Sequence, residues 1–285
     1  MTHILPQRNA DSSSSLVSFE ISPCQTNEET SDLIKRLKCL QFKPPLVGIA
    51  CHQLDATLSL AKEVQANGFD AMIHIAGGTM TEAEVADVLD TAQMIGLRHI
   101  LALRGDCVSE STDFPHTADL VRFIRKRTGK YFTIAVGGYP DTHPEAISPE
   151  MDIIYLKQKV ECGADFILTQ VVFTSERFND FVRRCREVGI TVPIVPGILL
   201  IENSQSLRKF ANICQVEVPE MLLKELEGVE NSSRDLQQWT HNVAAQIARD
   251  ILEAGTSDRA HFFTMNRVQE VQEMHSRLTS LSQCT

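Results

Sequence analysis

The sequence predicts an α/β fold, a (β/α)8 TIM barrel, and a recurring strand–helix pattern carries that prediction. Eight short runs rich in β-branched residues recur along the chain, and a helix-like stretch follows each of them. The expected strands are Leu16–Ser22, Leu46–Ala50, Asp70–Ala76, His99–Gly105, Thr133–Tyr139, Asp165–Val171, Pro193–Leu199 and His261–Met265. Eight such units within 285 residues favour closure into a barrel over an open sheet.

The character of these runs predicts parallel strands and amphipathic helices. Phe166–Leu168, for example, is continuously apolar, which is typical of a strand buried on both faces. Thr81, with Glu84 three positions later, predicts a capping box at the start of a helix. The buried face of that helix should carry Val85, Val88, Leu89 and Ala92. Four glycines lie between the end of a predicted helix and the next strand, and we expect each to adopt the left-handed conformation that ends a helix: Gly68, Gly96, Gly163 and Gly189.

We expect one domain over residues 16–285, because no linker of biased composition divides the strand–helix units. Residues 202–258 add helical sequence between the last two strands. Residues 1–15 contain four consecutive serines and no apolar run, which predicts a disordered leader.

The net charge and the cysteine pattern restrict which kinds of partner the protein binds and in which cellular compartment it lies. The net charge of −10 argues against nucleic-acid and anionic-membrane partners, and the basic run Arg122–Arg127 is interpreted as a solvated helix face. No apolar stretch reaches the ~18 residues of a membrane span. The 8 cysteines form no Cys-x-x-Cys pair, which predicts free, mostly buried thiols in a cytoplasmic protein. Association into a homo-oligomer stays open.

Polar residues collect where the predicted strands end, and the active site of such a barrel is built at those ends. They are Glu20, His74, Arg104, Asp106, Tyr139, His143, Gln170 and Arg267. Each has a structural alternative: an ion-paired Glu20, a hydrogen-bonded core His74, or an Arg104–Asp106 pair across a turn that Gly105 permits. Because all of them converge on one rim, we expect a functional site there.

A metal centre is the competing chemical interpretation of this rim. Its ligands would be His52, His74, His143 and Asp106. These residues lack the spacing of a known ligand set, and no His-x-His pair follows the first strand. We therefore expect no metal.

Six sequence blocks resemble the catalytic barrel of the methylenetetrahydrofolate reductase family. They are "SFEISP" (18–23), "HILALRGD" (99–106), "YPDTHPEA" (139–146), "LKQKVECGADFILTQVVF" (156–173), "VPIVPGIL" (192–199) and "HFFTMNR" (261–267). The blocks occur in the order of the family and lie on the predicted strands and strand ends. The chain is similar to short forms without a regulatory domain.

The resemblance implies a ping-pong reaction in which NADH or NADPH reduces a bound FAD and 5,10-methylenetetrahydrofolate is then reduced. It implies that Glu20 is the general acid and that Asp106 acts electrostatically near flavin and folate. The implied folate-binding residues are Gln170, Phe210 and Arg267. The implied flavin-binding residues are His74, Arg104, Gly105, Asp106, Tyr139, His143, Asp152 and Lys159. A folate is thus the expected small-molecule substrate.

The cofactor pocket departs from the family pattern at several positions. Ala50–Gln53 replaces the usual Thr-Tyr-Gly-Ala after the second strand. Tyr155 replaces an Asn, Gln158 an Arg, and Ser206 a Gln that contacts folate. Two hypotheses therefore stay open: an active FAD-dependent reductase, and a catalytically reduced barrel that binds folate or flavin and acts through partners.

Overall fold

Eight parallel strands form a closed barrel in the computed structural model, which describes residues 15–51 and 53–279. The strands are β1 (Val17–Ile21), β2 (Val47–Ile49), β3 (Ala71–Ala76), β4 (His99–Leu103), β5 (Thr133–Gly138), β6 (Phe166–Val171), β7 (Ile194–Leu199) and β8 (Ala260–Phe263). Each strand pairs in parallel with the next, and β8 pairs with β1 to close the ring. The predicted (β/α)8 barrel is confirmed, and the expected strand bounds differ from the observed ones by at most two residues.

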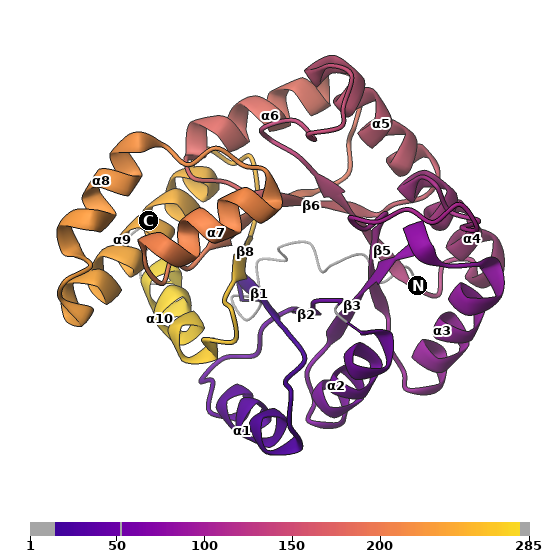
Figure 1. Cartoon of the computed structure of the whole chain (residues 1–285), viewed down its shortest axis with the longest axis horizontal. Coiled ribbons are helices and arrows are strands. Elements are labelled where there is room, and N and C mark those ends of the chain that lie inside the picture. Colours follow the sequence, from indigo (N-terminus) through magenta and orange to yellow (C-terminus); the bar gives the residue numbers. More distant parts are fainter. Residues whose placement is uncertain (1–14, 52, 280–285) are drawn as a thin grey trace.

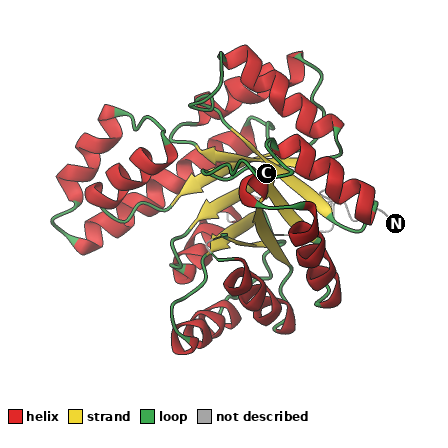
Figure 2. Cartoon of the chain, turned by 45° about the vertical axis from the view of Figure 1, so that its right-hand side comes forward, coloured by secondary structure: helices red, strands yellow, loops and turns green. Residues whose placement is uncertain are grey.

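Helices surround this ring of strands (Figures 1 and 2). They are α1 (Asn27–Lys38), α2 (Leu54–Ala66), the short 3-10 helix η1 (Gly77–Thr79), α3 (Glu82–Met94), α4 (Thr117–Thr128), α5 (Pro149–Glu161), α6 (Ser175–Glu187), α7 (Ser204–Cys214), α8 (Glu220–Val229), α9 (Ser233–Glu253) and α10 (Val268–Thr279). As the sequence predicted for residues 202–258, the three helices α7, α8 and α9 lie between β7 and β8.

Local sequence signals explain where these helices begin and end. The predicted capping box of α3 is present, since Thr81 accepts a hydrogen bond from the backbone of Glu84 and the Glu84 carboxylate accepts one from Thr81. The four predicted face residues of α3 are buried. The four glycines predicted to follow helices all have a positive φ, between 79° and 117°. Such left-handed residues let the chain turn back into the next strand without a Cβ clash.

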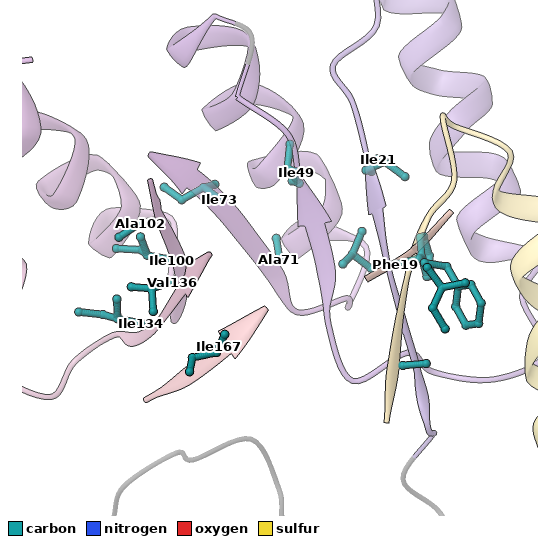
Figure 3. Close-up of a cluster of buried hydrophobic side chains, with 14 of the residues drawn as sticks. Phe19, Ile21, Ile49, Ala71, Ile73, Ile100, Ala102, Ile134, Val136 and Ile167 are labelled. Carbon is teal, nitrogen blue, oxygen red and sulfur yellow. The ribbon is translucent and has the colours of Figure 1, made fainter. Parts of the chain in front are cut away.

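The barrel strands separate two apolar regions. Outward-facing strand residues pack against the helices and form the main core, as Figure 3 shows for Phe19, Ile73 and Ile134. Inward-facing residues such as Met72, Leu101 and Leu168 form a second cluster inside the barrel. Along each strand, successive side chains point alternately outward to the main core and inward to the second cluster. Glu20 and His74 therefore share the inward face with the second cluster.

One expectation from the sequence is wrong, and two others are not tested by the described residues. The thiols are not mostly buried: among the described cysteines only Cys185 is buried, because the others lie at helix ends, in loops or on partly exposed faces. The expected leader, residues 1–15, lies almost wholly outside the described residues. The extent of the domain, residues 16–285, stays a prediction. Within the described residues, none of the helices combines the length and hydropathy needed to cross a membrane.

Candidate active site

The carboxyl ends of the strands bring the predicted site residues to one end of the barrel. Glu20 lies near the end of β1, His74 in β3 and Gln170 near the end of β6. The loops after β4, β5 and β8 carry Arg104, Gly105, Asp106, Tyr139, His143 and Arg267. Asp152 and Lys159 come from α5, and Phe210 comes from α7. Because all eight strands run parallel, these strand ends share one opening.

Glu20 and His74 form a pair of strongly shifted groups at this opening. Oε2 of Glu20 lies 3.7 Å from Nε2 of His74, and the Glu20 side chain keeps 21% of its surface exposed. Burial raises the pKa of Glu20 to about 7 and lowers the pKa of His74 to about 3. Both shifts arise because the protein around the pair disfavours charge. Near neutral pH the imidazole is therefore neutral, and the Glu20 carboxyl holds its proton to a much higher pH than an ordinary glutamate does.

A second imidazole lies deeper in the barrel. Nδ1 of His261 lies 3.0 Å from the hydroxyl of Ser18, and burial lowers the pKa of His261 to about 3. A Cβ added to Gly48 would lie 3.4 Å from Nε2 of His74 and 3.3 Å from Cε1 of His261, so this glycine makes room for both rings. Among the described atoms, both Nε2 nitrogens are buried without a hydrogen-bond partner.

These buried imidazoles predict a loss of stability in acid. Their folded pKa values lie below the ordinary 6.5, so the unfolded chain binds more protons as the pH falls below 6.5. Replacing His261 with Gln removes one group that binds a proton only in the unfolded chain. As the pH falls near 5, the free energy of unfolding of this variant should therefore decrease less steeply than that of wild type, by about 1.4 kcal/mol per pH unit. The raised pKa of Glu20 acts in the opposite direction but is common to both proteins.

Urea unfolding at several pH values measures this difference. His116→Gln is the matched control, because the side chain at residue 116 is exposed. If wild type and His261→Gln had equal pH slopes, His261 would bind its proton equally well in the folded and the unfolded protein, and this prediction would be wrong.

The predicted flavin-binding residues of the loop after β5 and of α5 form one contact cluster. The rings of Tyr139 and His143 meet edge to face with centroids 4.6 Å apart. The backbone N–H of His143 donates to Asp152 at 3.0 Å. The ammonium of Lys159 donates to the carbonyl of Gly137 at 3.2 Å and lies 5.7 Å from the centre of the Tyr139 ring. Burial lowers the pKa of Lys159 to about 8, and Asp152 opposes that shift.

Arg104 and Asp106 do not pair with each other. Arg104 instead forms a short ion pair with Glu145, from the loop after β5, which corrects the alternative of a pair across the turn. Gly105 between them has a φ of 88°, which a side chain would strain. Asp106 is exposed, and its charge contributes to raising the pKa of Cys214, to about 11, and of Tyr139, to about 12, although burial is the larger cause in both.

Gly78 fixes the loop that carries Arg104 and Asp106, and the sequence did not single it out for that role. Its N–H donates to the carbonyl of Arg104 at 2.7 Å, and its own carbonyl accepts from the N–H of Ser109 at 2.7 Å. A Cβ at this position would lie 2.6 Å from the Arg104 carbonyl oxygen and 2.7 Å from that of Cys107. The Gly-Gly pair directly after a strand was the available signal, because it permits a close backbone approach.

The three predicted folate-binding residues are held mainly by neighbouring protein groups. Arg267 pairs with Glu270 at 3.1 Å and donates to the carbonyl of Leu200. Oε1 of Gln170 accepts from the N–H of the next residue at 2.9 Å. Phe210 packs, partly buried, against the apolar cluster beneath α7 and α8. Their roles toward a ligand stay predictions.

The metal alternative has no geometric support in the part of the chain that the structure describes. There, no group of three or more His, Cys, Asp or Glu side chains has the arrangement of a metal site. One of the four residues considered, His52, lies outside the described residues.

Comparison with known proteins places this barrel in a family. The family model described as methylenetetrahydrofolate reductase matches residues 5–279. The chain belongs to the methylenetetrahydrofolate reductase family. The predicted resemblance is thereby confirmed.

Relatives of this family differ in how much of their length the chain spans. It is 38% identical over 211 residues to a probable methylenetetrahydrofolate reductase (NADPH) of Caenorhabditis elegans, covering 73% of this chain and 32% of that protein. A probable methylenetetrahydrofolate reductase (NADH) of Oryza sativa subsp. japonica is 32% identical, covering 91% and 47%. The chain thus spans a third to a half of these relatives. For 5,10-methylenetetrahydrofolate reductase of Pectobacterium carotovorum, 34% identical, the coverage is 89% and 86%.

A solved structure confirms the fold independently. It is an uncharacterized protein from Clostridium thermocellum that binds two copies of 5-methyl-5,6,7,8-tetrahydrofolic acid. The TM-score is 0.67 and the sequences are 14% identical, covering 95% of this chain and 96% of that one. At this identity the likeness concerns the fold.

Proposed function

We propose that the chain reduces 5,10-methylenetetrahydrofolate to 5-methyltetrahydrofolate, with electrons from NADH or NADPH and a bound FAD. The observation that carries this proposal is Glu20, a carboxyl of pKa about 7 at the same barrel opening as the cluster of Tyr139, His143 and Lys159. A proton donor active near neutral pH needs such a pKa. Membership of the family, and the 86% coverage of a bacterial relative, support the same reaction.

The residues beside this opening fit a flavin dinucleotide. Lys159 and Arg104 supply cationic donors for a pyrophosphate, and Tyr139 and His143 supply ring faces and edges. Lys159 is already withdrawn from water, so a phosphate would meet a poorly hydrated ammonium. Bound FAD would supply the hydride that this chain cannot supply itself.

The protein's own part in the reaction is protonation, charge stabilisation and orientation. Glu20 would protonate the amine that leaves when the five-membered ring of the folate opens. The negative charge of Asp106 would stabilise the cationic iminium that results. Oε1 of Gln170 is occupied by a backbone N–H, so its amide nitrogen is the group available to the pterin ring. Arg267, fixed by Glu270, would line the folate site.

Lys159→Ala should weaken FAD binding. The variant loses a charge-assisted contact worth roughly 1.5–3 kcal/mol, which corresponds to a dissociation constant about 10 to 150 times higher. Titration of the apoprotein with FAD, followed by flavin fluorescence, measures that constant. Lys126→Ala is the matched control, because Lys126 is exposed on α4. An unchanged constant for Lys159→Ala would remove this residue from the flavin site.

The alternative, a binding protein, rests on the residues that replace the family's usual Thr-Tyr-Gly-Ala after β2. Cys51, in the altered Ala50–Gln53 stretch, directs its thiol to the backbone of Ala76, next to the η1 turn. The purified protein decides between the two functions. A yellow protein with about one FAD per chain that accepts electrons from NADH or NADPH and passes them to methylenetetrahydrofolate supports the reductase. Ligand binding without electron transfer would replace the reductase by the binding protein.

A further inference from the structure

The junction between the first and last strands holds the backbone around Glu20 unusually firmly. The hydroxyl of Thr264, just after β8, donates to the carbonyl of Glu20 at 2.7 Å. Two residues later, Asn266 bonds both backbone groups of Ser22: its Oδ1 accepts from the N–H at 2.7 Å, and its Nδ2 donates to the carbonyl at 3.1 Å. These contacts join residues 244 positions apart.

The Asn266 side chain continues the hydrogen-bond ladder between β1 and β8 beyond the point where strand pairing ends. Pairing of β1 with β8 ends at Glu20 opposite Phe263, so Ser22 lies beyond the last strand pair. The carboxamide of Asn266 presents a carbonyl oxygen and an NH2 group side by side, so it can accept and donate at once, as successive peptide groups of a strand do. It therefore gives Ser22 the two hydrogen bonds that a further strand residue would have supplied.

The turn that places this carboxamide is strained, and its contacts retain it. Met265 and Asn266 both have a positive φ, 49° and 64°. Asn adopts this conformation readily, whereas Met does so at a cost of about 1–2 kcal/mol. The guanidinium of Arg36, from α1, donates to the carbonyl of Asn266 at 3.1 Å and fixes the turn from outside. A strained backbone of this kind persists only where the surroundings impose it.

We propose that Asn266 is a positioning residue for the general acid: its carboxamide holds the end of β1 so that the Glu20 carboxyl stays beside His74. The inference rests on the proposed function of Glu20. The titratable groups that face Glu20 are His74 from β3 and Cys214 from α7, with His261 of β8 below them. All three are uncharged near neutral pH, and burial is the cause of the raised pKa of Glu20, so exclusion of water governs its protonation.

The substitution Asn266→Gly separates the side chain from the turn. Glycine keeps the left-handed conformation but removes both hydrogen bonds to Ser22. The end of β1 should then loosen and admit water to Glu20. The pKa of Glu20 should fall by at least one unit from about 7 toward its ordinary 4.5. Asn266→Asp keeps the acceptor toward the Ser22 N–H and should restore part of the shift.

Two measurements read this change. Carbon-13 NMR of protein with labelled Glu carboxyls gives the pKa without any ligand, and Glu20→Gln assigns the signal. At about pH 8, above both pKa values, the rate of electron transfer to methylenetetrahydrofolate should fall about tenfold for a pKa lowered by one unit, because the protonated fraction of Glu20 falls in that proportion, while flavin reduction by NADH should be unchanged. Asn67→Gly, at the partly exposed C-cap of α2, is the matched control.

The outcomes are distinct. A Glu20 pKa of about 7 in folded Asn266→Gly would overturn the inference, since the carboxamide would then shape the turn alone. If Asn266→Gly does not fold, Asn266→Asp decides instead: loss of the donor to the Ser22 carbonyl should still leave the pKa of Glu20 below its wild-type value, and an unchanged pKa would overturn the inference. A wild type that passes no electrons to methylenetetrahydrofolate would refute the proposed function. In that case a fall of the Glu20 pKa in Asn266→Gly would still establish the positioning.

Discussion

Glu20→Gln should slow electron transfer to methylenetetrahydrofolate by roughly 10²–10⁴-fold, the range for loss of a positioned general acid. Glutamine keeps the shape of the side chain but has no transferable proton. Reduction of the flavin by NADH or NADPH needs no proton from this carboxyl, so that half-reaction should keep nearly its full rate. The expected effect is therefore confined to one half of the reaction.

Stopped-flow absorbance of the flavin follows the two half-reactions separately. Glu63→Gln, at an exposed position on α2, controls for the loss of a carboxylate as such. The rate in wild type should also decline as the pH rises through about 7, because the proton is then lost from Glu20. If Glu20→Gln slowed both half-reactions equally, Glu20 would be a structural residue and its assignment as the acid would be wrong.

Gly78→Ala has the second large expected effect. The new methyl group would overlap two backbone carbonyl oxygens, those of Arg104 and Cys107, so a backbone segment must move. Overpacking of this kind costs roughly 1–3 kcal/mol. Displacement of the loop should also carry Arg104 away from the cluster and weaken FAD binding.

Chemical unfolding and FAD titration report the two consequences of Gly78→Ala. Gly228→Ala is the matched control, because nothing lies within 4 Å of the added Cβ in α8 and alanine favours a helix. That control should be neutral or slightly stabilising. If the Gly78→Ala protein had wild-type stability and wild-type FAD binding, the loop after β4 would accommodate the methyl group without cost, and this prediction would be wrong.

The sequence predicted the strands well because their signal is local. Strands buried on both faces must be apolar throughout, so a run such as Phe166–Leu168 marks its own position. Knowledge of the barrel then placed Glu20, Asp106 and Gln170 at one end, since parallel strands end together. The location of the site was thus predictable, whereas the chemical roles of its residues stay predictions.

The contacts that complete the site were not predictable, because each joins segments without a periodic relation. Gly78 bonds the carbonyl of Arg104, and Glu145 pairs with the Arg104 guanidinium, for which the sequence had suggested Asp106 only as an alternative partner. Asn266 bonds Ser22 across 244 positions. The burial of the cysteines was misjudged for a related reason. Exposure depends on which face of each element meets a neighbour, and hydrophobicity of the residue type alone does not decide it.

The seam between β1 and β8 also determines when the acid is ready during protein synthesis. The backbone partners of Glu20 and Ser22, Thr264 and Asn266, leave the ribosome more than 200 residues after them. Arg104, Tyr139 and Lys159 are made much earlier and lie on consecutive units. Contacts of such long sequence separation form late, because loop closure must precede them. A nascent chain therefore carries the residues of the flavin cluster long before the partners that fix the backbone of Glu20 are made.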